Sequence, residues 1–465
     1  MNQGKTKGII LFGAGVYAKK YKALLEYLHL DFAFFTDNDP SKWGTTLYGK
    51  NVISPDKISG MPDYKVIISS THEIAIKAQL ETMGLSDRIM DLKNLYELCE
   101  LRMEEDAVRN VSVNAESTVL VDMYEGIGWG GSELWAANLA YGLHNRGVKS
   151  ILLGGTEQPL LEERYESLTI RFSEEETIMQ MVNLFEANLP CIFVNNFAGC
   201  AYMAAIIVKR KYPNLIKIIS VIHNDNKSLF DAHMILQEYI DKVFCVSNQI
   251  KTRMRELYNF RPDCFYFKEQ PIPIEQGYCR KWNSEETVQI GYAARLVRQQ
   301  KRADLLVDLI AYLELKNLDY VFNIAGEGEC ASALIEYVRA NKLDKKVRLW
   351  GRLPKEEMPD FWKKQDIFVN VSEYEGTSLS MLEAMSYECV PVTTDVSGAA
   401  EFIRENVNGY ICKVGDIGGV ASCVEKLLGD RRKLISYGQQ CRKIIQERCN
   451  PEQYIDYWIR YILEL

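Results

Sequence analysis

The stretch EGTSLSMLEAM, residues 375–385, follows an apolar run that predicts a buried strand from Asp366 to Val371. Thr377 and Ser378 carry hydroxyl groups of the kind that cap helices, so the chain is expected to turn from loop to helix there. The free amides of a helix N-terminus attract anions, and Gly376 lets a ligand approach the backbone. This order of strand, loop and helix predicts an α/β fold with a phosphate site at the end of a strand.

Two carboxylates bracket the loop with seven residues between them, Glu375 before the helix and Glu383 inside it. At about 1.5 Å per residue, Glu383 lies roughly 8 Å beyond the cap. Carboxylates accept hydrogen bonds from hydroxyls, so the pair suits a ligand with a sugar and a ribose on either side of a diphosphate. We interpret the loop as a nucleotide-sugar site. The alternative is an ordinary helix in which Glu383 is a capping-box partner of Ser380.

The composition is that of an ordinary soluble globular protein. The 465 residues suggest about three modules, and 47% are hydrophobic and 25% charged. The net charge of −8 opposes broad nucleic-acid binding, so we expect no nucleic-acid partner.

The cysteines and apolar runs predict a cytoplasmic protein. Twelve cysteines are scattered singly, without C-x-x-C pairs or a secretory leader, which indicates reduced thiols. Apolar runs such as Tyr202 to Val208 are far shorter than the roughly 20 residues that span a bilayer. The basic cluster Lys209-Arg210-Lys211 is a candidate for peripheral contact at the inner face of the membrane, or simply solvated surface.

Short apolar strands alternate with helical patterns throughout, which predicts parallel sheets with crossover helices. We expect a small Rossmann-like domain at 1–99, a linker at 100–116, doubly wound domains at 117–280 and 281–450, and a C-terminal helix at 451–465. Tyr454, Trp458 and Tyr461 fall on one face of that helix, which predicts packing against a domain surface.

In the third module, Arg295 and Lys301 lie in the loop between a strand and an amphipathic helix expected from Asp304 to Leu315. Ligands of parallel sheets bind at the carboxyl ends of strands, where two cations suit a diphosphate. Taken alone, the two residues are better explained as solvated loop charges, but their occurrence together with Glu375 reverses that preference. Gly326 and Gly328 follow the next strand and form a tight turn against which a base or ribose could lie, although this pattern is weak by itself.

The second module offers two further candidates at the carboxyl ends of strands. Gly130 and Gly131 expose backbone amides after the strand expected from Thr118 to Met123, unless the loop is merely flexible. His223 ends the strand expected from Lys217 to Ile222. The histidines and acids of this region are too dispersed for a ligand set, so no metal is expected.

Together these motifs resemble the family 4 retaining glycosyltransferases of GT-B architecture, over roughly residues 118–465. The resemblance covers the motifs above and the later run SGAAE, residues 397–401, followed by Asn408-Gly409. It implies two facing Rossmann-like doubly wound domains, preceded here by a third small one.

The resemblance also implies roles for the residues. Arg295 and Lys301 would bind the donor diphosphate, Glu375 would contact the transferred sugar, and His223 would approach that sugar. The remaining donor-binding residues would be Glu383 at the ribose, the amides of Thr377, Ser378 and Leu379 at phosphate, and Gly376, Gly326, Gly328, Gly130 and Gly131 along the backbone. No cofactor or metal is implied beyond the nucleoside diphosphate sugar, most readily a UDP- or GDP-sugar.

The first module carries Gly13 and Gly15 after a strand expected from Gly8 to Phe12, with Asp37 after the strand that follows. That context fits a dinucleotide fingerprint, so an NAD or nucleotide site is one interpretation. The module also resembles the small Rossmann-type domains of polysaccharide-assembly enzymes, notably in the run DNDPSKWG, residues 37–44. A degenerate docking module is the other interpretation.

We therefore expect a retaining, metal-independent glycosyltransferase that moves a sugar to a glycan or lipid-linked acceptor in surface polysaccharide assembly. One rival is an inactive GT-B scaffold that binds nucleotide sugar or a partner. The other is an NAD-linked sugar-nucleotide enzyme that uses the first module.

Overall fold

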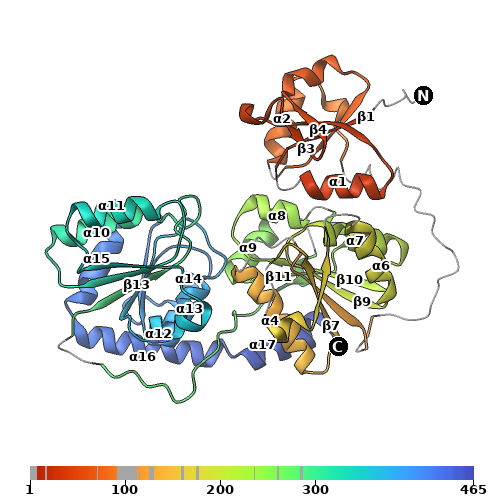
Figure 1. Ribbon diagram of the computed structural model, residues 1–465. Coiled ribbons are helices and arrows are strands. Elements are labelled where there is room, and N and C mark those ends of the chain that lie inside the picture. Colours follow the sequence, from red (N-terminus) through yellow and green to blue (C-terminus); the bar gives the residue numbers. More distant parts are fainter. Residues whose placement is uncertain are drawn as a thin grey trace. The chain divides into compact units, whose positions relative to one another are not determined.

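The computed structural model describes residues 8–15, 18–70, 72–91, 113–114, 116–124, 130–158, 162–173, 177–234, 236–258, 261–282 and 286–464. These residues form three sheets, each covered by helices (Figure 1). The linker expected at 100–116 lies largely outside the described residues. The proposed domain limits remain predictions.

The first sheet has the strand order β3-β4-β2-β1-β5, parallel except for the β3–β4 pair. Its elements are β1 (Gly8–Phe12), α1 (Ala18–Tyr27), β2 (Phe32–Thr36), β3 (Thr46–Leu47), β4 (Lys50–Ile53), β5 (Tyr64–Ile68) and α2 (Glu73–Thr82).

The second sheet has the order β12-β11-β10-β9-β6-β7-β8. Its strands are β6 (Thr118–Asp122), β7 (Ser150–Gly155), β8 (Thr169–Phe172), β9 (Cys191–Asn195), β10 (Ile216–Ile222), β11 (Lys242–Cys245) and β12 (Phe265–Phe267). The helices between them are α4 (Gly131–Asn145), α5 (Glu163–Glu166), α6 (Thr177–Ala187), α7 (Cys200–Lys211), α8 (Lys227–Met234) and α9 (Asn248–Leu257).

The third sheet is parallel and has the order β15-β14-β13-β16-β17-β18. Its strands are β13 (Gln289–Ala293), β14 (Val321–Ala325), β15 (Val347–Gly351), β16 (Ile367–Asn370), β17 (Val390–Thr394) and β18 (Tyr410–Cys412). The helices are α10 (Leu305–Leu315), α11 (Ala331–Ala340), α12 (Met358–Trp362), α13 (Leu379–Ser386), α14 (Ala399–Phe402), α15 (Ile417–Leu428), α16 (Arg431–Arg448) and α17 (Pro451–Tyr457).

Both faces of this third sheet are buried. Apolar residues of α10, α11 and α15 form the core on one face, and those of α12, α13 and α16 form the core on the other (Figure 1). A parallel sheet covered on both faces presents its functional groups at the strand ends, where the loops emerge.

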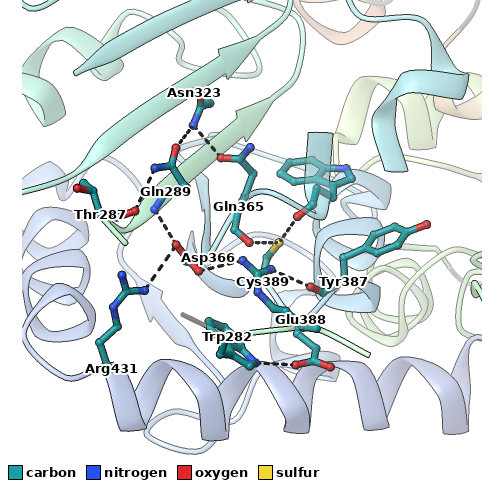
Figure 2. A network of polar contacts seen from close by, with 12 residues as sticks. Trp282, Thr287, Gln289, Asn323, Gln365, Asp366, Tyr387, Glu388, Cys389 and Arg431 are labelled. Carbon is teal, nitrogen blue, oxygen red and sulfur yellow. Dashed lines mark hydrogen bonds and ion pairs between the residues drawn. The ribbon is translucent and has the colours of Figure 1, made fainter. Parts of the chain in front are cut away.

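A buried polar network lies at the amino end of this sheet (Figure 2). Asp366, just before β16, accepts a hydrogen bond from the Gln289 amide at 2.7 Å and pairs with Arg280 at 2.9 Å. Arg280 also donates to the Tyr387 carbonyl, and Trp282 donates its indole N–H to the Glu388 carboxylate. Burial raises the pKa of Asp366, against the opposing effect of Arg280. Asp366 and Arg280 both find polar partners inside this network, which is therefore a structural feature.

The internal contacts divide the chain into two compact units. One unit contains Ile222–Asn226 together with Phe244–Trp458, and the other contains Met1–Val221, Lys227–Val243 and Ile459–Leu465. The short segment with His223 therefore groups with the third sheet's unit, although it directly follows β10.

The C-terminal helix differs from the prediction. Tyr454 and Trp458 are buried, but Tyr461 is 48% exposed. Because Trp458–Leu463 winds as a π-helix, residue 461 turns away from the face that an α-helix would give it. Within the described part of the chain, no helix has both the length and the hydropathy that crossing a bilayer requires.

Candidate functional site

The loops that follow β13 and β16 bring together charges that are 74 residues apart in the sequence. Lys301 Nζ lies 2.5 Å from Glu375 Oε1, and both side chains are largely buried. β13 and β16 are neighbouring parallel strands, so their carboxyl ends open at the same edge. The structure thus places two predicted site residues in direct contact.

Neighbouring polar groups hold the Glu375 carboxylate in place. Ser372 Oγ lies 2.8 Å from Glu375 Oε1 and 2.6 Å from Asn370 Oδ1. The Asn370 side chain also accepts the Ser372 amide at 3.0 Å. These contacts fix one carboxylate oxygen, which leaves the group well oriented for hydroxyl recognition.

Arg295 is the exposed cation of this group. Its guanidinium donates to Gln300 Oε1 at 3.0 Å, and Gln300 Nε2 lies 3.3 Å from Asn224 Oδ1. The site therefore offers a diphosphate two cations, the exposed Arg295 guanidinium and the largely buried Lys301 ammonium.

Helix α13 begins as the sequence predicts. Ser378 is its N-cap and accepts a hydrogen bond from the Met381 amide, and Leu379 is the first helical residue. Thr377 Oγ1 donates to the Val246 carbonyl at 2.8 Å, which fixes the turn before the cap. Because Ser378 is the cap, the alternative of a capping box from Ser380 is wrong.

Glu383 lies in α13, partly exposed at its surface. Burial raises the pKa of its carboxyl to about 7, and Trp362 and Lys355 only partly offset this effect. The group is therefore part-protonated near neutral pH, and its charge responds to any ligand that donates hydrogen bonds to it.

Gly376 is required by the protein backbone itself. A Cβ at this position would lie 1.8 Å from the His223 carbonyl oxygen. A Cβ at Gly398 would lie 2.6 Å from Thr377 Oγ1 and is disfavoured by φ of +80°. Packing alone therefore requires a glycine at this position, and contact of Gly376 with a donor stays a prediction.

Gly326 and Gly328 have a similar explanation. Both have positive φ, and a Cβ would lie 1.9 Å from the Ala294 carbonyl and 2.4 Å from the Leu296 carbonyl, respectively. The Leu296 amide and carbonyl also bond to Glu327 and Cys330 in this turn. The two glycines therefore set the path of the Arg295 loop, and direct donor contact stays a prediction.

His223 is joined to the Glu375 loop through its own segment, because the Asp225 amide donates to the Glu375 carbonyl at 3.1 Å. Burial lowers the pKa of His223 to about 3, so its imidazole is neutral at physiological pH. A neutral imidazole recognises a hydroxyl by hydrogen bonding and contributes no positive charge.

Gly130 and Gly131 stand at the start of α4, with Gly130 as the N-cap. The preceding loop, 125–129, lies outside the described residues. Their proposed contact with a donor stays a prediction.

In the dinucleotide-like fingerprint of the first sheet, the Asp37 carboxylate accepts hydrogen bonds from neighbouring loop residues. Asp37 Oδ2 accepts the Ala14 amide at 2.8 Å and Lys42 Nζ at 2.9 Å, and Oδ1 accepts the Asp39 amide at 2.9 Å. Burial alone would raise the pKa of Asp37, but these hydrogen bonds hold it below its usual range. Both oxygens thus accept hydrogen bonds from the protein, and a role for Asp37 as a ribose ligand stays a prediction.

The glycines of that fingerprint differ from each other. Gly13 has φ of +125°, and a Cβ there would lie 2.5 Å from the Ser69 carbonyl, so the backbone requires a glycine. Gly15 has open space at its Cβ position. An NAD or nucleotide site in this sheet stays a prediction.

Two other expectations concern ions and membranes. Within the described ranges, no three His, Cys, Asp or Glu side chains gather where they would hold a metal ion.

In the basic cluster, Lys209 pairs with Asp241 and Lys211 with Glu186, which neutralises part of its charge. Membrane contact stays a prediction.

Sequence reasoning missed Gln300 and Asn224, which connect the loops around Arg295. A glutamine beside a predicted phosphate-binding lysine was the only signal, and it has no fixed spacing to mark it.

Family models match two parts of the chain. Residues 279–444 match the family described as Glycosyl transferases group 1, and residues 5–90 match the family described as C2185-like, N-terminal.

The chain is also similar to curated glycosyltransferases. It is 23% identical over 275 residues to N-acetyl-alpha-D-glucosaminyl L-malate synthase of Bacillus anthracis, covering 56% of this chain and 69% of that protein. It is 29% identical over 173 residues to poly(ribitol-phosphate) alpha-N-acetylglucosaminyltransferase of Staphylococcus aureus, covering 37% of this chain and only 34% of that one.

Among solved structures, Anabaena HepE in complex with UDP-glucose matches with a TM-score of 0.62 at 16% identity, covering 75% of this chain and all of HepE. An identity this low establishes the fold alone. The expected α/β architecture is confirmed: the chain has the GT-B fold, and the match to the glycosyl transferases group 1 family lies within it at residues 279–444.

Proposed function

We propose that this protein is a family 4-type retaining glycosyltransferase that transfers a sugar from a UDP-sugar to a glycan or lipid-linked acceptor. The observation that carries the proposal is the contact between Lys301 and Glu375 at the carboxyl end of β13 and β16, beside the capped N-terminus of α13. Cations, a carboxylate and free helix amides are the groups that a sugar diphosphate needs.

The donor would lie across this edge. Its diphosphate would contact Arg295, Lys301 and the amides that begin α13, with the sugar against Glu375 and His223 and the ribose at Glu383. In the transfer, the bond from the anomeric carbon to the diphosphate oxygen breaks, and a bond to the acceptor oxygen forms on the same face. The acceptor proton passes to the departing diphosphate, so the protein contributes orientation and charge and forms no covalent intermediate. The reaction requires no metal.

Several matches support the choice of donor. The names of the two relatives described above both contain an N-acetylglucosaminyl group, and the HepE structure is a complex with UDP-glucose. UDP-N-acetylglucosamine is therefore the first donor to test, and assembly of a surface polysaccharide in the cytoplasm is the proposed setting.

The test is release of UDP from UDP-N-acetylglucosamine, UDP-glucose and UDP-galactose by the wild type and by Arg295→Ala. We expect one donor to be preferred and the variant to lose about 100-fold in turnover, because a charge that stabilises the leaving group is gone. Arg298→Ala, an exposed arginine on the same loop, is the matched control and should keep its activity. Full activity in Arg295→Ala would refute the proposed donor site.

A further inference from the structure

Gln300 lies where three loops of one unit meet. Its Oε1 accepts from the Arg295 guanidinium at 3.0 Å, and its Nε2 lies 3.3 Å from Asn224 Oδ1 and 3.5 Å from the Tyr374 carbonyl. Its backbone carbonyl accepts the Glu373 amide at 2.9 Å. One side chain therefore touches the loop of Arg295, the segment of His223 and the loop of Glu375.

This bridge needs a carboxamide. Its acceptor end faces a guanidinium, and its donor end faces two oxygens. A carboxylate would place its second oxygen against those oxygens, and an ammonium would oppose the arginine. Glutamine satisfies both ends.

The segment that Gln300 reaches is also held by contacts with the Glu375 loop and with Arg253. The Asp225 amide bonds to the Glu375 carbonyl, and the Asp225 carboxylate pairs with Arg253. The Gly376 position leaves no room between this segment and the Glu375 loop. A shift of the segment would therefore change where His223 stands relative to Glu375.

We propose that Gln300 is a positioning residue that holds the Arg295 guanidinium and the His223 segment in one fixed arrangement. The proposal rests on the donor site proposed above. Gln300 itself need not touch the reacting atoms. It acts through Arg295 at the diphosphate and through Asn224 at the sugar side of the site.

The experiment compares Gln300→Ala, Asn224→Ala, the double variant and the exposed neighbour Gln299→Ala as control. The first readout is amide hydrogen exchange of residues 222–226 without ligand, and the second is kcat and KM for the preferred UDP-sugar. For Gln300→Ala we expect the Asp225 amide to exchange about 3- to 10-fold faster, as loss of one hydrogen bond implies. We expect kcat to fall about 10- to 100-fold, with a smaller change in KM.

The double variant should be no worse than Gln300→Ala, because both changes break the same bridge. Gln299→Ala should match the wild type in both readouts. Unchanged exchange in Gln300→Ala, or faster exchange with unchanged kcat, would overturn the positioning role while leaving the donor site standing. A wild type that neither binds UDP nor consumes any UDP-sugar would overturn the proposed function and this proposal together.

Discussion

Strand β16 carries a cation–carboxylate pair near each of its ends, and the two pairs differ in what surrounds them. Near its amino end, Asp366 meets Arg280 at 2.9 Å, and beyond its carboxyl end Glu375 meets Lys301 at 2.5 Å. Three of the four side chains are less than 10% exposed, and Lys301 is 17% exposed. Distance and burial alone therefore do not separate a structural pair from a functional one.

The surroundings separate them. The Asp366 pair is completed by the Gln289 amide and the Tyr387 carbonyl inside the network of Figure 2. The Glu375 pair lies beside the exposed Arg295 and the start of α13. A charge pair at the amino end of a parallel sheet serves the fold, whereas one at the carboxyl end is placed for a ligand.

The largest expected effect is on stability at the amino end. Arg280→Ala leaves the Asp366 carboxylate buried without its closest cation, so unfolding should become easier by about 3–5 kcal/mol. Urea denaturation measures this. Arg431→Ala is the control, with a smaller loss because Arg431 lies 3.9 Å from Asp366. If both variants lost the same free energy of unfolding, the short Asp366–Arg280 pair would contribute no more to stability than the longer Asp366–Arg431 contact.

The next effect is on turnover at the carboxyl end. Lys301→Ala should lower kcat about 100- to 1,000-fold, equivalent to about 2.7–4 kcal/mol of transition-state stabilisation. Arg302→Ala, a neighbour paired with Glu373 at the surface, should change turnover little. If Lys301→Ala destabilised the fold as much as Arg280→Ala but stayed active when folded, the Lys301–Glu375 pair would be structural and not functional.

A smaller effect depends on pH at Glu383. Its pKa is about 7 in the folded protein against 4.5 ordinarily, so between these values the folded state keeps a proton that the unfolded state has lost. Stability from this group therefore falls as pH rises from 4.5 through 7. Glu383→Gln should be more stable than the wild type at pH 8, by about 3 kcal/mol at most, and nearly equal at pH 4.5. Urea denaturation of both proteins at pH 4.5 and pH 8 checks this. A stability difference between variant and wild type that did not change with pH would contradict it.

The smallest effect concerns Asp37 in the first sheet, whose carboxylate is engaged by its own loops. Asp37→Ala should destabilise the protein by about 1–2 kcal/mol through lost hydrogen bonds. Turnover of a UDP-sugar should stay unchanged. Asp31→Ala, which breaks an exposed pair with Lys50, is the control and should cost less. Loss of UDP-sugar turnover in Asp37→Ala would assign the first sheet a part in the reaction.

Much of the fold and the position of the candidate site could be predicted from local sequence patterns together with a general rule for parallel sheets. The Ser378 cap follows from local chemistry, and the strand from Gly8 to Phe12 was predicted with its observed limits. The meeting of Lys301 with Glu375 follows from the rule that parallel strands open their loops at one edge.

The missed features depend on tertiary contacts. The hydrogen bond from Gln300 to Asn224 joins residues 76 positions apart in the sequence, and no local sequence pattern predicts it. Gly376 is explained by the His223 carbonyl, which sequence spacing does not reveal. The short strands β4 (KNVI) and β8 (TIRF) were not predicted, because each mixes polar and apolar residues over only four positions, whereas the equally short β16 (IFVN) lies in an apolar run.

The most direct test of the central claim is a calorimetric titration with UDP of the wild type, Arg295→Ala and Arg280→Ala. We expect the wild type and Arg280→Ala, measured where the latter is folded, to bind UDP with similar affinity, and Arg295→Ala to bind at least about 10-fold more weakly. Undiminished binding by Arg295→Ala, or no binding by the wild type, would contradict a donor site at the carboxyl end of β13 and β16.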